Sequence, residues 1–255
     1  MSSAGHADWL RPDWGVAGVG ALMSTRAGGV SEGPFGSMNI RGGLGDNPLA
    51  VSRNQALFAT ATGARPVWLD QVHGKEVVHL RAEHLGHQPT ADASICTEPG
   101  IACTVQVADC LPVLFAAPGG RGVGGAHAGW RGLSAGVLEA TVAALCGAAA
   151  CTPGELSAWL GPCIGPRRFE VGADVLQAFG AEPSREAQPF FVPQADGKWM
   201  ADLAGLARAR LERAGLARVS GGQWCTVEDA SRFFSFRRDR VTGRMAAAVW
   251  LDRRG

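Results

Sequence analysis

Three apolar runs of strand length follow one another in the middle of the chain. They span 101–107, 112–117 and 123–126, with Ala108–Leu111 and the turn PGGRG (118–122) as their connections. Short apolar runs bounded by turn residues are typical of buried strands. The sequence therefore predicts three strands here, with Cys110 in the first connection and His127 directly after the third strand.

Other elements are predicted along the rest of the chain. Further strands are expected at Val16–Thr25 and Pro66–Leu69, and the tail is expected to form a hairpin with strands near 233–238 and 244–251. Helices are expected over Leu133–Leu145 with Gly147 as C-cap, over 171–179 before Gly180, and from the N-cap Asp202 to Gly215. No linker, low-complexity tract or repeat divides the chain, so we expect one mixed α/β domain over 1–255.

Composition excludes several classes of protein. The content of 46% hydrophobic and 18% charged residues, with a net charge of +1, describes an ordinary globular chain without the electrostatic footprint of a nucleic-acid or membrane-surface binder. Neither a signal peptide nor a membrane-spanning run is found in the sequence. The seven cysteines form an odd set without CxxC spacing, so we expect reduced thiols and a cytoplasmic location.

Three segments carry residues suited to metal chemistry: QVHG with His73, ADC with Cys110, and HAGWRG with His127. Thiolate and imidazole ligands suit zinc or copper, whereas magnesium and calcium prefer oxygen. Three protein ligands leave a fourth coordination position for water or substrate, as in catalytic zinc sites. The alternative is that His73 caps a loop, His127 bonds a backbone carbonyl and Cys110 is a core residue.

Neighbouring residues suggest an anionic substrate. Asp109 is expected to orient an imidazole or to carry a proton, unless it only forms an Asx-turn. The segment from Gly129 through Arg131 precedes a predicted helix, and helix-start N–H groups with a guanidinium can bind an anion. A second glycine-rich loop with an arginine lies at Arg26–Ser31. Both loops could equally be plain turns.

The motifs together resemble a known family over nearly the whole chain. They are TRAGGVS (25–31), SMNIRGGLGDNPLAVSRN (37–54), LDQVHG (69–74), ADA (91–93), QVADCLPVLF (106–115), GAHAGWRG (125–132), LGPCIGPRRFEVG (160–172), DL (202–203), CT (225–226) and FFSFRRDRVTGR (233–244). The chain resembles the bacterial polyphenol oxidase/laccase-domain proteins, also described as purine nucleoside phosphorylases and peptidoglycan-editing factors. The resemblance implies a single-domain α/β/β/α layered sandwich with mixed sheets, and His73, Cys110 and His127 as zinc ligands.

The same resemblance implies phosphorolysis of purine nucleosides (adenosine, inosine and methylthioadenosine), with adenosine deamination at the same site. Cys110, Asp109 and His127 are then the expected catalytic residues. Arg26 or Arg131 is expected to hold phosphate, and Asn39 and Gln71 to help bind the substrates. Nucleosides and phosphate are the expected partners of a monomer or homodimer, with zinc as cofactor and copper as the other possible metal.

Three other functions remain open. Cys110 could act as a nucleophile with His127 or His73 as base, or a zinc hydrolase could use the same residues, and either chemistry would suit editing of peptidoglycan precursors. A zinc-binding partner protein without turnover is the non-enzymatic alternative. A multicopper oxidase needs many imidazoles, and this chain has six His and no His-x-His pair, which disfavours that function. The family often has Tyr where this chain has Phe169 and Phe236. Either those phenols are not catalytic or this protein has lost something, and the intact ligand positions favour the first interpretation.

Overall fold

The three central apolar runs are strands, as predicted, in a computed structural model that describes residues 6–184 and 186–252. They are β5 (Ile101–Val107), β6 (Leu111–Ala116) and β7 (Val123–Ala128). β6 and β7 pair antiparallel, but β5 belongs to a different sheet. The connection that carries Cys110 therefore crosses from one sheet to the other.

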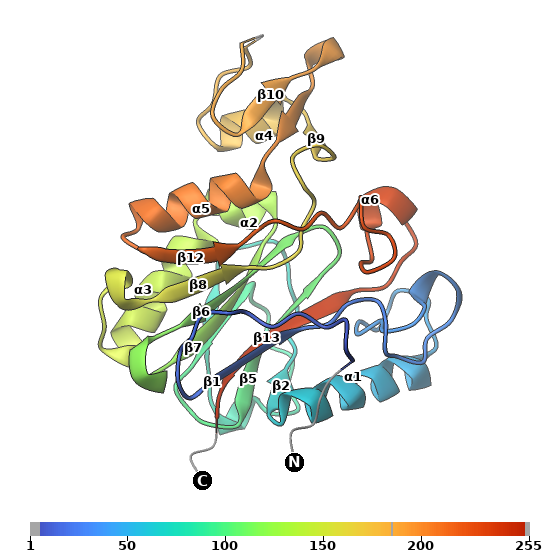
Figure 1. The fold of residues 1–255 in the computed structure, drawn as a ribbon, viewed down its shortest axis with the longest axis vertical. Coiled ribbons are helices and arrows are strands. Elements are labelled where there is room, and N and C mark those ends of the chain that lie inside the picture. Colours follow the sequence, from blue (N-terminus) through green and yellow to red (C-terminus); the bar gives the residue numbers. More distant parts are fainter. Residues whose placement is uncertain (1–5, 185, 253–255) are drawn as a thin grey trace.

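Two sheets form the body of the molecule (Figure 1). The four-stranded sheet has the order β1-β13-β5-β2 and adds β1 (Val19–Met23), β2 (Arg65–Val67) and β13 (Met245–Leu251). The six-stranded sheet has the order β12-β8-β6-β7-β4-β3 and adds β3 (Val77–Leu80), β4 (Ala93–Cys96), β8 (Ser157–Leu160) and β12 (Arg218–Gly221). Parallel and antiparallel pairs occur in both, which confirms the expected mixed sheets.

Helices cover the outer face of each sheet, which gives the expected α/β/β/α layers (Figure 1). The helices are α1 (Pro48–Thr62), α2 (Trp130–Ala135), α3 (Val137–Ala149), α4 (Ala173–Ala178), α5 (Leu203–Arg213) and α6 (Phe236–Asp239). Phe58 of α1 packs with residues of β1, β5 and β13, whereas Leu138 of α3 and Leu206 of α5 belong to the core on the six-stranded sheet. A third apolar cluster, with Val105 and Leu114, fills the space between the sheets.

A small lobe projects beyond the two sheets at the top of Figure 1. It holds α4 and a three-stranded sheet of the order β10-β11-β9, made of β9 (Glu170–Val171), β10 (Phe191–Pro193) and β11 (Trp199–Ala201). The helix predicted near 171–179 is α4, and Gly180 after it has a positive φ of 71°. Asp202 caps α5 as predicted, because its carboxylate accepts a hydrogen bond of 2.8 Å from the N–H of Gly205.

Two predicted elements are wrong in detail. The helix expected over Leu133–Leu145 is divided into α2 and α3 at Gly136, whose φ of 97° breaks the helical path. Gly147 lies inside α3, which extends to Ala149. The tail forms no hairpin, because 233–235 is a loop and 236–238 belong to α6, and β13 pairs instead with β1 and β5.

Helix α1 was not predicted from the sequence. Asn47 caps this helix by accepting from the N–H of Leu49, Pro48 occupies its first position, and Gly63 ends it with a φ of 65°. These are ordinary start and stop signals. Within the described residues, every helix is too short or too polar to cross a membrane.

Candidate metal centre

Sheet register places Cys110 and His127 side by side. Leu111 of β6 pairs with Ala128 of β7, and Pro112 pairs with His127, so Cys110 directly before β6 lies opposite Gly129 directly after β7. An added Cβ at Gly129 would lie 3.0 Å from Cys110 Sγ and 3.1 Å from His73 Cδ2. Because Gly129 has no side chain, Cys110 and His73 can approach each other at this point.

The three side chains, called the trio below, form a compact donor set. Their ligand atoms all lie within 4.8 Å of one another, and Cys110 Sγ is 3.8 Å from His73 Nε2. Tetrahedral zinc with ordinary bond lengths separates sulfur and nitrogen ligands by roughly 3.6 Å. One thiolate and two imidazoles at these distances fit zinc, with a fourth position left open. The structure therefore brings together the three residues that the sequence analysis selected as ligands.

Asp92 holds both histidines of the trio, and the sequence analysis assigned it no role. Its fully buried carboxylate is 2.7 Å from His127 Nδ1, which leaves Nε2 of that ring for a metal. The same carboxylate accepts hydrogen bonds from the N–H groups of Val72, His73 and Gly74. His73 has a φ of 62°, an uncommon conformation for a residue with a side chain, and these bonds stabilise it.

Charges in the site favour the ionised forms of Cys110, Asp92 and His127. Burial opposes ionisation of His127, but Cys110 and Asp92 outweigh it and raise the pKa of that imidazole to about 9, so a metal at Nε2 has to displace a proton. Burial opposes ionisation of Cys110, but the charge and hydrogen bonds of His127 and His73 outweigh it and lower the pKa of the thiol to about 6. Burial likewise opposes ionisation of Asp92, and hydrogen bonds from His127 and the backbone outweigh it and hold the pKa below its usual value. By contrast, burial raises the pKa of Cys96, Cys103 and Cys163. Cys110 is thus set apart from these buried thiols.

Asp109 does not orient an imidazole, contrary to expectation. Its Oδ1 accepts a hydrogen bond of 2.6 Å from the hydroxyl of Thr226, and its Oδ2 accepts one of 2.6 Å from the N–H of Arg237. The φ of Asp109 is 89°, so it occupies a strained turn directly before Cys110. Its carboxylate ties this turn to the C-terminal loop and α6.

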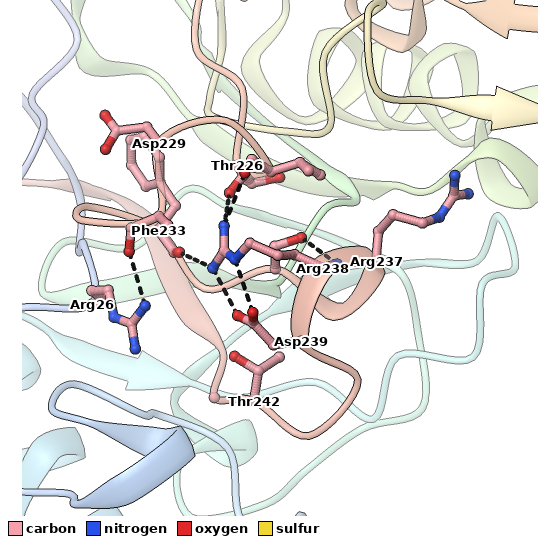
Figure 2. A network of polar contacts seen from close by, with 12 residues as sticks. Arg26, Thr226, Asp229, Phe233, Arg237, Arg238, Asp239 and Thr242 are labelled. Carbon is pink, nitrogen blue, oxygen red and sulfur yellow. Dashed lines mark hydrogen bonds and ion pairs between the residues drawn. The ribbon is translucent and has the colours of Figure 1, made fainter.

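That loop is held in turn by Arg238 (Figure 2). The guanidinium donates to the carbonyl groups of Thr226, Val227 and Phe233 and pairs with Asp239 at 2.7 Å. Figure 2 shows these bonds converging on one side chain. The network fixes α6, and so it fixes the position of Phe236 beside the trio.

Two cavities meet at the trio, and His73, Cys110 and Phe236 line both. The aromatic cavity, of about 300 Å³, is lined further by Trp130, Phe169 and Leu203, together with Arg131, Arg237, Arg240 and Asp109. The glutamine cavity, of about 380 Å³, is lined further by Gln71, Gln106, Arg41, Arg244 and His127. Only the glutamine cavity contains all three members of the trio in its wall.

The expected substrate-binding residues divide between these cavities and the scaffold. Arg131 lines the aromatic cavity, with its guanidinium 4.3 Å from the ring centre of Trp130. Gln71 lines the glutamine cavity and exchanges two hydrogen bonds with the backbone of Gln106, of 2.9 and 2.8 Å.

Arg26 and Asn39 line neither cavity. The guanidinium of Arg26 donates to the carbonyl groups of Gly36 and Ala230, and lies 4.9 Å from the ring centre of Phe234. Asn39 is fully buried, donates to Asp46 and accepts from the N–H of Arg244. Both residues join the 26–46 segment to the C-terminal loop.

Sequence reasoning missed Asp92, Arg41, Gln106 and Arg244. Each lies in a motif already quoted, but residue type alone could not separate it from its neighbours. Asp92 had one usable signal: it is an acidic residue directly before a short run, Ala93–Cys96, that the structure shows to be the buried strand β4, in a chain with a histidine metal site.

The fold and the site together define a class of protein: a layered α/β protein with a candidate metal site, formed by the trio, beside two cavities. Comparison with known proteins agrees with this class. The family model for multi-copper polyphenol oxidoreductase laccase matches residues 20–252, and the chain belongs to this family.

Curated relatives and solved structures are similar over almost the full chain. A protein named purine nucleoside phosphorylase from Pseudomonas aeruginosa is 50% identical over 96% of this chain and 98% of its own. The purine nucleoside phosphorylase YfiH of Escherichia coli is 48% identical over 95% of this chain and 96% of its own. A Neisseria meningitidis crystal structure matches with a TM-score of 0.89 and 46% identity, covering 96% of this chain and 100% of that one. YlmD from Geobacillus stearothermophilus matches with a TM-score of 0.88 and 31% identity, covering 96% of each chain.

Proposed function

We propose that the protein is a zinc-dependent purine nucleoside phosphorylase. The observation that carries this proposal is the 50% identity, over 96% of the chain, with a curated protein named for that activity. The trio and its two cavities support it, because the site offers separate compartments for an aromatic base and for a polar co-substrate. Adenosine, inosine and methylthioadenosine are the proposed nucleosides.

The aromatic cavity suits the purine. Trp130, Phe169 and Phe236 present aromatic rings to it, and stacking on such rings stabilises a bound base. Phe169 and Phe236 keep this surface apolar, since neither has a phenol hydroxyl. Arg131, which is stacked on Trp130 in the wall of this cavity, is proposed to contact the base.

The reaction exchanges one bond at the sugar for another. A phosphate oxygen bonds to the anomeric carbon, the bond from that carbon to the base nitrogen breaks, and its electron pair leaves with the base. The base takes up a proton, and the products are free base and ribose 1-phosphate. Asp109, in the wall of the aromatic cavity, is the proposed proton carrier, held by Thr226 and Arg237.

His73, Cys110 and His127 are the proposed zinc ligands. A bound zinc would supply a Lewis acid and lower the pKa of a coordinated water towards ~7, which is the chemistry that adenosine deamination needs. Asp92 fixes the ring of His127 and the loop of His73 for this purpose. We propose the deaminase as a second activity of the same site.

The two alternative functions, a thiol hydrolase and a multicopper oxidase, require different residues in the site. A thiol hydrolase is favoured by one observation, the lowered pKa of Cys110 beside His127, but an ionised thiol is also what a zinc ligand requires. A multicopper oxidase would need more ligands, and within 6–184 and 186–252 the trio is the one group of three or more His, Cys, Asp or Glu residues close enough to share an ion.

Release of free base from inosine and adenosine tests the proposal. We expect base to appear only when phosphate is present, with about one zinc per chain, and both to be lost in Cys110→Ala. Cys151→Ala is the matched control, since Cys151 is a partly exposed thiol that lines neither cavity. Amino-acid release from a muropeptide nucleotide without phosphate, and no base from nucleosides, would contradict it in favour of the peptidoglycan-editing hydrolase.

A further inference from the structure

Two arginines line the glutamine cavity without an acidic partner. Among the described residues, neither Arg41 nor Arg244 forms an ion pair. Arg244 donates to the carbonyl groups of Thr242 and Gly243 at 3.0 and 3.1 Å. The side chain of Arg41 donates no hydrogen bond within the part of the chain that the structure describes, and it is only partly buried. Both guanidinium groups therefore keep donors for a ligand.

These two like charges face one cavity, which is unfavourable without an anion. Burial, followed by the nearby charge of Arg41, lowers the pKa of the Arg244 guanidinium, and Cys110 and Asp109 act in the opposite direction. Like charges at short range repel most strongly where water is scarce. An anion with several oxygens placed between two guanidinium groups would remove the repulsion and accept hydrogen bonds from both.

Gln106 gives an independent sign of a ligand in the same cavity. The residue is 5% exposed, and its Oε1 is buried without a hydrogen-bond partner among the residues that the structure describes. An unsatisfied buried acceptor is costly, so a site of this kind is completed by a ligand that donates a hydrogen bond. A sugar hydroxyl is such a donor, and Gln71 holds the Gln106 backbone in place for it.

We propose that Arg41 and Arg244 form the subsite for inorganic phosphate, with Gln106 accepting a hydrogen bond from a hydroxyl of the adjacent ribose. The subsite rests on the proposed phosphorylase function and replaces Arg26 and Arg131 as the phosphate-binding residues. Arg26 lines neither cavity, and Arg131 lies on Trp130 in the other one. Phosphate in the glutamine cavity then approaches the anomeric carbon from the side opposite the base, which occupies the aromatic cavity.

Direct binding of inorganic phosphate to the zinc-loaded protein, measured by calorimetry without nucleoside, tests the subsite. We expect Arg41→Met and Arg244→Met each to raise the Kd about tenfold or more, the loss typical of one charge-assisted contact. Arg53→Met is the matched control, since Arg53 is exposed on α1 and outside both cavities, and it should change the Kd by less than about twofold. Binding that is unchanged in both cavity variants, or lost in Arg131→Met instead, would overturn the proposal.

Two further measurements distinguish loss of ligand binding from loss of folding. Arg41 makes no side-chain hydrogen bond that folding depends on, so Arg41→Met carries the test alone if Arg244→Met fails to fold. Gln106→Met should raise the KM for inosine several-fold and leave the Kd for phosphate unchanged. An unchanged KM for inosine would show that Gln106 does not bind the ribose.

Failure of the subsite and failure of the function look different. If phosphate binding depends on both arginines but no nucleoside is cleaved, the proposed phosphate subsite stands and the proposed phosphorylase activity is refuted. If cleavage depends on phosphate but the KM for phosphate is unchanged in both arginine variants, the proposed phosphorylase activity stands and the proposed phosphate subsite is refuted.

Discussion

The trio is built from two regions that hold their ligands in different ways. Cys110 and His127 are placed by the register of β6 and β7, inside a sheet whose core is fully buried. His73 lies in an exposed loop in a left-handed conformation, and the Asp92 carboxylate holds that loop by accepting three consecutive backbone N–H groups. One part of the site thus depends on sheet pairing, and the other on one side chain.

Asp92 also connects the two regions, because it bonds the ring of His127 as well as the loop of His73. Removal of a strand-borne ligand should therefore disturb the fold, whereas removal of the loop-borne ligand should disturb only the metal.

The largest difference is expected between His127→Ala and His73→Ala. Both should abolish zinc binding, but His127 is 3% exposed and pairs with the buried Asp92. Its loss leaves that carboxylate without its imidazole, and we expect the free energy of unfolding of the metal-free protein to fall by about 3 kcal/mol. His73→Ala, at an exposed position, should cost less than about 1 kcal/mol.

Urea denaturation of both variants after chelation measures these values. Equal losses of unfolding free energy would contradict the division between strand-borne and loop-borne ligands. Zinc content checks that both variants have lost the site.

A smaller effect is expected for Asp92→Asn, which keeps the shape of the side chain and removes its charge. The amide offers one acceptor oxygen where the carboxylate offers two. The variant therefore loses either the bonds of Oδ1 to His127 and His73 or those of Oδ2 to Val72 and Gly74. We expect zinc affinity to fall by about 10–100-fold, the usual cost of losing a partner of a metal-bound histidine. Competition with a chromophoric chelator measures it.

Asp46→Asn is a control for the same chemical change outside the trio's hydrogen bonds, since Asp46 bonds Ser31 and Asn39. If Asp92→Asn binds zinc as tightly as the unaltered protein does, the Asp92 carboxylate is not what holds the His73 loop in place.

The two regions also differ in how far the sequence predicted them. The apolar runs predicted β5, β6 and β7 and thereby the positions of Cys110 and His127, because burial on both faces leaves a continuous apolar signal. The spacing of the trio could not show that His73 joins them, and the family resemblance supplied that step. Asp92 stayed hidden because its role depends on contacts about 19 and 35 residues away.

The C-terminal segment was mispredicted for a related reason. FFSF has the composition of a strand, but Phe233 and Phe234 are fully buried in a loop, and Arg238 binds the carbonyl group of Phe233, which lies in the expected hairpin strand. Tertiary hydrogen bonds to one arginine decided the local structure (Figure 2). The cavities, lined by residues from several separate segments, could not be predicted from any one of these segments.

The smallest effects on zinc binding and stability are expected from alanine substitutions at two glycines, one beside the trio and one on the surface of α3. Gly129→Ala places a Cβ 3.0 Å from Cys110 Sγ, so it should displace a ligand and weaken zinc binding several-fold, although both strands remain paired. Gly147→Ala lies inside α3 with nothing within 4 Å of the added Cβ, and it should raise the free energy of unfolding by about 0.5–1 kcal/mol and leave zinc affinity unchanged. Thermal unfolding and zinc competition on both variants check this pair, and an unaltered zinc affinity in Gly129→Ala would mean that the ligands adjust to the added methyl group without loss.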